Sequence, residues 1–363
     1  AIPLLADERA LAYLSCPGRS VPYRGELLYS LLSVALSYDP HGFSVPYAGY
    51  FTGAKQEAFV RLCLQVLGLL LQGPADTATL APDAWNARRP QEQPGDAGRP
   101  LPEHGPHAFR QLLAGISSHR EISFMVDSVS TLLGTISDER GTYLPKSIRV
   151  PEFLSELLVV VFHLSSCDAF VVGACGEGEI AALVEGILHV PGEAPDHLRD
   201  DTLGLLTWAT LVRLTTYREV CIGLNADFEG DAPNDVQDFS GSLADLVALA
   251  ALKHVSDYFA TARVNSFHRC IVEAALSAVA NISIFAEDLC IHTSTRFFAV
   301  FERCAKSVKS RRGSRGGAVW LPYLLEIMVY VVQYQYATNQ HIAYGMVTRM
   351  ALFKELQTVA AEP

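Results

Sequence analysis

The apolar residues of this chain recur, in nearly every segment, at the three- and four-residue spacing of one face of an α-helix. Two stretches show this spacing most clearly. Ser118 and Glu121 form a capping-box signature ahead of a stripe made of Ile122, Met125, Val129, Leu132, Leu133 and Ile136. A second stripe, Val272, Ala275, Leu276, Val279 and Ile282, is opposed by Glu273, Ser277 and Asn281. Both stretches are predicted to be amphipathic helices with one solvated side.

No segment shows a convincing strand alternation, so the chain is predicted to be all-α. Helices are expected over residues 24–38, 54–72, 107–117, 119–136, 151–165, 178–189, 196–215, 242–260, 266–286, 293–308, 319–337 and 339–358. Helices of about 10 to 20 residues joined mostly by short turns favour stacked helical pairs. No fixed repeat period accompanies them, so a single helical-repeat domain over 1–363 is inferred from the lengths of the elements.

Two segments interrupt the helical pattern, and neither is expected to be a domain boundary. Residues 73–106 contain seven prolines, a composition that predicts a flexible insertion. Residues 224–241 are predicted to form an acidic loop. Positions 1, 3, 5 and 12 of a calcium-binding loop would be Asp227, Glu229, Asp231 and Asp238. Because Ala232 replaces the glycine needed at position 6, a solvated loop is favoured over a metal site.

The overall charge limits the partners of the protein. The 28 basic and 39 acidic residues give a net charge of -11, which argues against nucleic acid and against general attraction to anionic lipid. One run, at 306–315, is basic and contains Lys306, Lys309, Arg311, Arg312 and Arg315. This run is a candidate contact for anionic lipid head groups or for an acidic patch of a partner, and the alternative is a solvated loop between helices.

The apolar runs at 62–72 and 157–162 are shorter than the roughly 18 to 20 residues that span a bilayer, so no transmembrane helix is predicted. Segment 319–336 is apolar almost all round and is expected to be deeply buried. Pro322 is placed near its start, where a missing N–H costs little. The first residues lack the pattern of a signal peptide and an initiator Met, so the sequence is expected to be an excerpt of a longer chain.

The sequence contains no serine elbow, no zinc-binding helix motif and no Cys with a placed His. The eight cysteines are expected to be buried free thiols in a reducing compartment: Cys16, Cys63, Cys167, Cys175, Cys221, Cys270, Cys290 and Cys304. The glycines of 171–180 are in the wrong order for a phosphate loop, so a helix end is favoured there. No catalytic, cofactor-binding or metal-binding residue is predicted, and the protein is expected not to be an enzyme.

The histidines give no second site. His104 and His107 are three residues apart at the end of the insertion and lack a second pair of metal ligands. His163, His254 and His268 are single residues on predicted helices, where a local hydrogen bond is the usual role.

The stretch YDPHGFSVPYAGYF, residues 38–51, combines a turn signature with five aromatic residues. Asp39, Pro40 and Gly42 fit a type I turn, and Pro46 keeps the preceding residue out of helical conformation. The aromatic side chains, Tyr38, Phe43, Tyr47, Tyr50 and Phe51, are predicted to pack a rigid corner between two helices. A ligand pocket is the lesser alternative.

Together with the preceding ELLYSLLSVALS, this stretch resembles a signature of the Hid-1 family, the high-temperature-induced dauer formation proteins related to dymeclin. Further blocks resemble the family in the same order, at 112–133, 155–172, 242–257, 280–285 and, most clearly, 324–356. The resemblance implies an armadillo- or HEAT-like α-solenoid, peripheral association with Golgi membranes and a role in secretory and dense-core vesicle formation. It implies no enzymatic activity, and residue 1 is alanine where a myristoylated family member would have glycine.

We therefore expect a cytoplasmic scaffold on Golgi or trans-Golgi membranes that binds other proteins of the secretory pathway. Membrane association would come from parts outside this sequence or from the basic run. A helical-repeat adaptor unrelated to Golgi traffic is the alternative, and an enzyme without a recognisable motif is the third hypothesis. The identity of the partner, its binding surface and the oligomeric state are left open.

Overall fold

The computed structural model describes residues 23–40, 54–72, 107–141, 150–176, 178–193, 201–228, 239–260, 266–309 and 317–361. Within these ranges there are fifteen helices and no strand, so the all-α prediction is confirmed for this part of the chain. The nearest approach to a sheet there is an isolated antiparallel bridge between Asp227 and Ser242. The predicted insertion at 73–106 lies outside the described residues.

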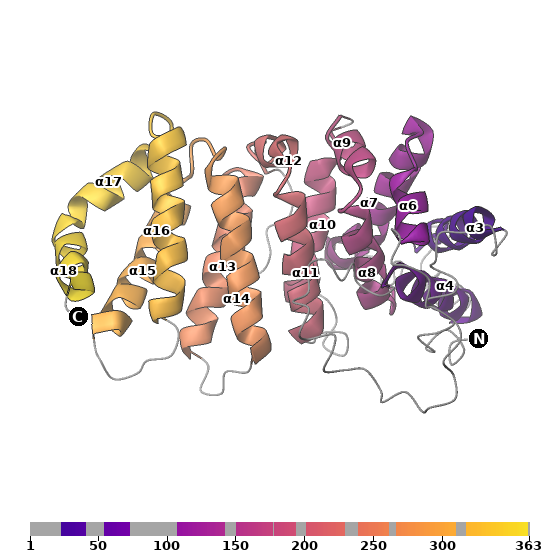
Figure 1. Ribbon diagram of the computed structural model, residues 1–363, viewed down its shortest axis with the longest axis horizontal. Coiled ribbons are helices and arrows are strands. Elements are labelled where there is room, and N and C mark those ends of the chain that lie inside the picture. Colours follow the sequence, from indigo (N-terminus) through magenta and orange to yellow (C-terminus); the bar gives the residue numbers. More distant parts are fainter. Residues whose placement is uncertain are drawn as a thin grey trace, which may run out of the picture.

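Ten of these helices form two rows that run along the long axis of the molecule (Figure 1). The first row consists of α4 (Ala54–Gln72), α8 (Leu154–Leu164), α11 (Asp201–Leu214), α14 (Ser266–Ser283) and α16 (Gly317–Tyr334). The second row consists of α7 (His119–Gly141), α10 (Ile180–Glu193), α13 (Leu243–Ala260), α15 (Ile291–Lys309) and α17 (Gln340–Thr348). Along the chain, successive members of this set alternate between the rows, so the core is a continuous layer between them.

The remaining helices lie at the ends and the edge of the two rows (Figure 1). They are α3 (Arg24–Leu36), α6 (Ala108–Ala114), α9 (Asp168–Gly176), α12 (Arg218–Gly223) and α18 (Met350–Ala361). The N-terminal end is formed by α3 and α4, and the C-terminal end by α17 and α18. Two of the five, α9 and α12, contact each other at one edge of the array.

The predicted amphipathic stripes are where the periodicity placed them. In α7, the stripe from Ile122 to Leu133 is buried, and the carbonyl of Ser118 accepts the first amide hydrogen bonds of the helix. In α14, the stripe from Val272 to Ile282 is buried. The opposite side, predicted to be solvated, is only half-exposed at Glu273, Ser277 and Asn281, and Asn281 donates to the Thr215 hydroxyl, 3.2 Å away. Helical periodicity therefore identified the buried faces of these two elements correctly.

The predicted set of helices needs three corrections. Helices α9 and α12 were not predicted, because they have only nine and six residues and follow turns closely. The single helix expected over 339–358 is broken at Arg349 into α17 and α18. A short helix offers too few turns for a periodic signal, and a break held by tertiary contacts leaves the local pattern intact.

The predictions for segment 319–336 need two corrections. Helix α16 begins at Gly317, so Pro322 is its sixth residue and removes an internal hydrogen bond instead of occupying the tolerated first position. The helix is also not deeply buried, since Val329, Val332 and Tyr334 are all exposed. One face packs against α14 and α15, and the opposite face is left in contact with solvent.

The bilayer prediction also changes. By length and hydropathy, α16 is long and apolar enough to cross a membrane, with 18 residues and a mean hydropathy of 1.3. The pair α8 and α9 would pass the same test only if counted as one span, although the pair is bent by 96°. The packing of α16 against α14 and α15 accounts for the apolar residues on one face of this helix.

Candidate interaction surfaces

The residues that the sequence singled out as metal ligands are not brought together in the described part of the chain. Asp227 lies beside the start of α13, where the Phe228 amide donates to the Gly241 carbonyl at 2.9 Å and closes the base of the acidic loop. The other three proposed calcium ligands lie outside the described residues. In the ranges that are described, no group of three or more His, Cys, Asp or Glu side chains could hold a metal ion.

The histidines have structural surroundings. His107 is the N-cap of α6, and its Nδ1 accepts a hydrogen bond from the Arg110 amide at 3.3 Å. Burial, together with the positive charges of Arg110 and Arg213, lowers the pKa of His163 to about 4. His254 packs edge-on against Trp208 with ring centroids 5.5 Å apart. His104 lies outside the described residues.

The glycine run 171–180 ends a helix, as predicted. Gly178 has a φ of 76°, in the left-handed region that favours glycine. Its amide donates to the Cys175 carbonyl, and the Glu179 amide donates to the Ala174 carbonyl, at 3.2 and 3.1 Å. This pair of bonds is a Schellman motif at the end of α9. The run is therefore a helix terminus.

The described cysteines are free thiols, and most are buried or half-buried. Burial raises the pKa of Cys167 and Cys175 to about 11 and that of Cys221 and Cys304 to about 12. These four thiols are protonated at neutral pH and are poor nucleophiles. The prediction of burial is wrong for Cys270, which is exposed on α14. Cys16 lies outside the described residues.

The predicted aromatic corner is described only at its start. Helix α3 ends at Leu36, and Tyr38 is buried against Phe153 in an edge-on contact with ring centroids 5.3 Å apart. Residues 41–51, with Gly42 and the other four aromatic side chains, lie outside the described residues. The rigid corner and the pocket alternative therefore stay predictions.

The surface that sequence reasoning missed lies at the C-terminal end of the array. An open groove of about 540 Å³ separates the outer side of α16 from α17 and the start of α18. We call it the end groove, and it is lined by Val332, Tyr336, Ala337, Gln340, Ala343, Tyr344, Met346, Val347 and Met350. None of these residues is charged. Tyr344 and Val347 are 72% and 69% exposed, so large apolar side chains face solvent here.

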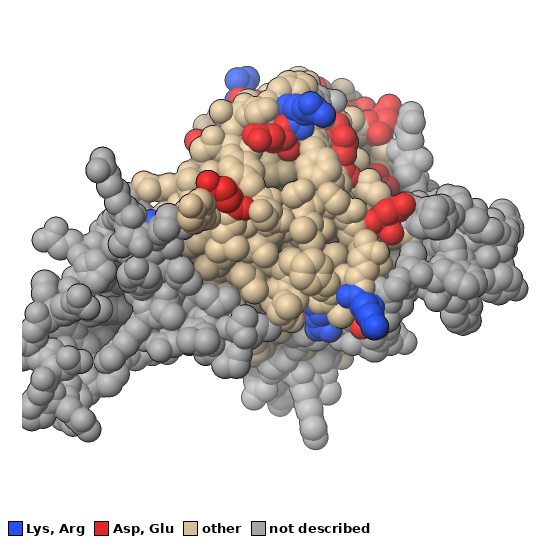
Figure 2. Space-filling view, turned by 90° about the vertical axis from the view of Figure 1, so that its right-hand side faces the viewer, with Lys and Arg blue, Asp and Glu red and all other residues tan. Residues whose placement is uncertain are grey.

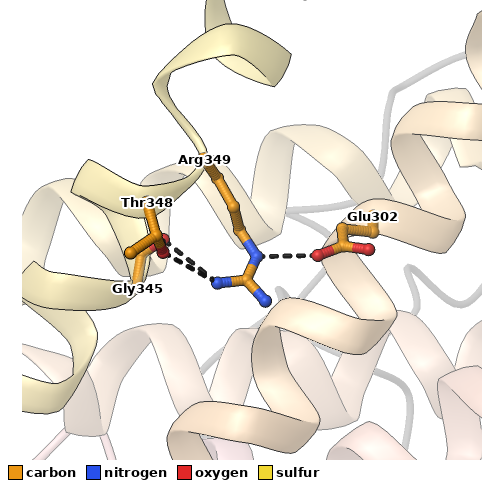
Figure 3. A network of polar contacts seen from close by, with 4 residues as sticks. All are labelled: Glu302, Gly345, Thr348 and Arg349. Atoms are coloured by element: carbon orange, nitrogen blue, oxygen red, sulfur yellow. Dashed lines mark hydrogen bonds and ion pairs between the residues drawn. The ribbon is translucent and has the colours of Figure 1, made fainter.

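Arg349 fixes the far wall of the end groove (Figure 3). Its Nε donates to the Glu302 carboxylate on α15 at 2.7 Å, and another guanidinium nitrogen donates to the Gly345 carbonyl and the Thr348 hydroxyl. The guanidinium also lies 4.6 Å from the centroid of the Phe298 ring. One side chain therefore ends α17 and ties it to α15.

Gly345 allows this close approach of the two helices. The residue is buried in α17, and a Cβ at this position would overlap the Phe298 ring. Phe298 itself is buried between Phe297 and Phe301 and cannot move aside easily. Beyond the break, Phe353 of α18 stacks on Phe301 with ring centroids 5.1 Å apart.

The turn that connects α14 to α15 is held by polar side chains from other elements. Asn339 donates to the Ala286 carbonyl at 2.7 Å and accepts from the Leu289 amide at 2.9 Å. Asn225 bridges two further backbone groups of the same turn, and the fully buried Asp245 accepts from the amide of Cys290. These contacts make the C-terminal half a rigid support for the end groove.

The opposite end of the array also presents uncharged side chains. Figure 2 looks onto this end and shows a broad area without Lys, Arg, Asp or Glu, with charged side chains around its edge. Exposed apolar residues here are Leu27, Tyr29 and Val34 of α3 and Phe59 and Leu62 of α4. Both ends of the array are therefore apolar surfaces of the kind that contact other polypeptide segments.

These observations define a protein whose described part is built from helices alone and presents apolar surfaces at both ends of the array. Residues 6–363 match the family described as high-temperature-induced dauer-formation protein, Hid1. The chain belongs to the Hid1 family.

Two curated relatives give the extent of the similarity. The chain is 25% identical to Protein HID1 of Mus musculus and 24% identical to Protein HID1 of Homo sapiens, each over 341 residues. These alignments cover 93% of this chain and 41% of either relative, so the chain spans less than half the length of those proteins. No solved structure matches it.

Proposed function

We propose that this protein is a non-enzymatic helical scaffold that supports Golgi and trans-Golgi trafficking and the formation of secretory, dense-core vesicles through protein contacts. Membership of the Hid1 family supports the trafficking role and the location on the cytoplasmic side of Golgi membranes. The end groove is the observation that carries the scaffold role, because it holds large apolar side chains exposed on a rigid support.

The architecture that we propose is an α-solenoid of the armadillo or HEAT type. Strict alternation of successive helices between two rows supports it, since each pair contacts mainly the pairs before and after it. In such an array the last helix of a row has no following neighbour in that row, so one apolar face stays uncovered. The exposed side of α16 has this character.

The proposed occupant of the end groove is an apolar helix face of a partner protein. Tyrosine and methionine side chains such as Tyr344, Met346 and Met350 adapt to an incoming helix and bury large areas without leaving an unpaired charge. Because Arg349 holds α17 against α15, this wall of the end groove is already ordered before binding, and less conformational entropy is lost when the partner binds.

The test combines a groove variant with imaging of the full-length protein. Val347→Lys places a charge in the groove, and Val172→Lys, at an exposed valine of α9, is the matched control. We expect the wild type and the control to reach Golgi membranes with the same captured partners, and Val347→Lys to lose partners. A uniformly nuclear or mitochondrial wild type would refute the trafficking role. Equal capture by all three proteins would refute the groove as the contact.

The second candidate function, a helical-repeat adaptor outside Golgi traffic, predicts a different result of the same experiment. Such an adaptor would lose partners on Val347→Lys while the wild type stays away from Golgi membranes. The absence of catalysis is part of the proposal, and a turnover activity that survives purification would contradict it.

A further inference from the structure

The outer side of α15 carries exposed cations that no described carboxylate neutralises. Arg296, Arg303 and Lys306 are exposed, and we call them the basic stripe. The helix has one acidic residue, Glu302, and that carboxylate is bound to Arg349 at 2.7 Å. The protein has a net charge of -11, so an unneutralised positive stripe is a local departure from its overall charge.

The geometry of the stripe is linear. Its members are separated by seven and three residues, which places them on one side of the helix. From Arg296 to Lys306 the helix rises about 15 Å, the length of about four to five residues of extended chain. Arg303 is held in place, because its guanidinium lies 5.0 Å from the centroid of the Phe259 ring of α13. A guanidinium stacked in this way keeps its N–H groups available at the edge.

The positive excess is one helix wide. Elsewhere in the same row the charges have both signs, with the half-buried Lys253 and the exposed Asp257 on the neighbouring α13, and the exposed Arg120 and Asp127 on α7 at the far end of the row. A flat anionic membrane laid on this side would face those carboxylates together with the cations. A narrow ligand that follows α15 would meet the three cations and one carboxylate, Glu302, which Arg349 already neutralises.

We propose that the basic stripe binds an acidic peptide segment of a partner protein, laid along the outer side of α15. The negative net charge repels such a segment elsewhere on the molecule, so the stripe supplies selectivity for one position. A purely structural role accounts for only part of the stripe. Arg303 and Lys306 lie in the last two turns, where the helix dipole stabilises a cation, but Arg296 is the sixth of nineteen residues and lies nearer the N-terminus, where the dipole does not stabilise a cation. The proposal depends neither on the end groove nor on the trafficking role.

The experiment measures binding of a fluorescent peptide of about ten glutamates to the full chain by anisotropy, at about 20 mM and about 150 mM salt. The test variant is the triple substitution Arg296→Gln, Arg303→Gln and Lys306→Gln. The control variant removes the same charge at three other exposed cations, Arg120→Gln, Arg218→Gln and Lys354→Gln. Vesicles of phosphatidylcholine and phosphatidylserine form the membrane arm, and thermal melts verify that each variant is folded.

We expect the wild type and the control variant to bind the peptide, more tightly at low salt. The stripe variant should lose about ten- to a hundredfold in affinity, the sum expected for three exposed charge contacts. Equal binding by the stripe and control variants, or no binding by the wild type, would overturn the proposal. Binding of the vesicles without binding of the peptide would also overturn it and assign the stripe to a membrane.

Discussion

Replacing Gly345 by alanine tests whether α17 is placed by its contact with the Phe298 ring. In the interior of an exposed helix, glycine to alanine stabilises by about 0.5–1 kcal/mol. At Gly345 the added methyl group would overlap a ring that is 1% exposed and packed against Phe297 and Phe301. Overpacking of this kind costs about 1–3 kcal/mol. The expected net effect is a loss of about 1–2 kcal/mol in the stability of α17.

The matched control is Gly134→Ala in α7, where an added Cβ has no neighbour within 4 Å. This substitution should stabilise its helix by about 0.5–1 kcal/mol, so the two variants should differ in sign. A change of 1 kcal/mol shifts the melting temperature of a chain this long by about 2 °C or less. Amide hydrogen exchange, which reports local opening of α17 and of α7 separately, is therefore the better assay.

A second variant connects the effect to the ring. Trimming the neighbour in the double variant Gly345→Ala with Phe298→Leu should recover part of the loss, and the double-mutant cycle measures that coupling. If Gly345→Ala slows exchange in α17 as Gly134→Ala does in α7, the close contact does not place the helix. The description of the wall of the end groove would then be wrong.

Three further predictions concern polar side chains. Asn339→Ala should destabilise the turn 284–290 by about 2–4 kcal/mol, because it leaves two buried backbone groups unpaired, and faster amide exchange confined to that turn would verify it. His163 has a pKa of about 4 in the folded protein, below its ordinary 6.5, because its surroundings disfavour the charged imidazolium. Its contribution to stability is therefore complete above pH 6.5, where the side chain is neutral in both states. That contribution to the free energy of unfolding, at most about 3 kcal/mol, should be lost as the pH falls from 6.5 to 4. Denaturation measured at several pH values checks this. His163→Gln should not show the loss, and the exposed control His292→Gln should show it as the wild type does. Arg349→Lys should lower the free energy of local opening of α18 by about 1 kcal/mol, so its amides exchange faster. Lysine keeps the positive charge but loses the several guanidinium hydrogen bonds and the stacking on Phe298. Unchanged exchange would contradict the role of the contacts in Figure 3.

Much of the candidate surface could not be read from the sequence. The contacts of Asn339 with the turn before α15 join residues about fifty positions apart, and the contact of Asp245 with Cys290 spans 45. No local pattern reports a partner at that separation. The sequence does contain a local pattern that includes Asp245. This residue follows Ser242 by three positions, the spacing of a capping box, and the two residues are hydrogen-bonded in the structure.

The sequence by itself determined the helical class, the buried faces of α7 and α14, and the family resemblance that the comparisons confirmed. Helical periodicity is a property of a single segment, so it can be recognised without knowing which other helices pack against that segment. Only the tertiary structure decided which side of α16 stays in solvent. An apolar residue is buried only when a second element covers it, and α16 is covered on one side by α14 and α15. The end groove lies where apolar residues of α16 and α17 are not covered by a further helix.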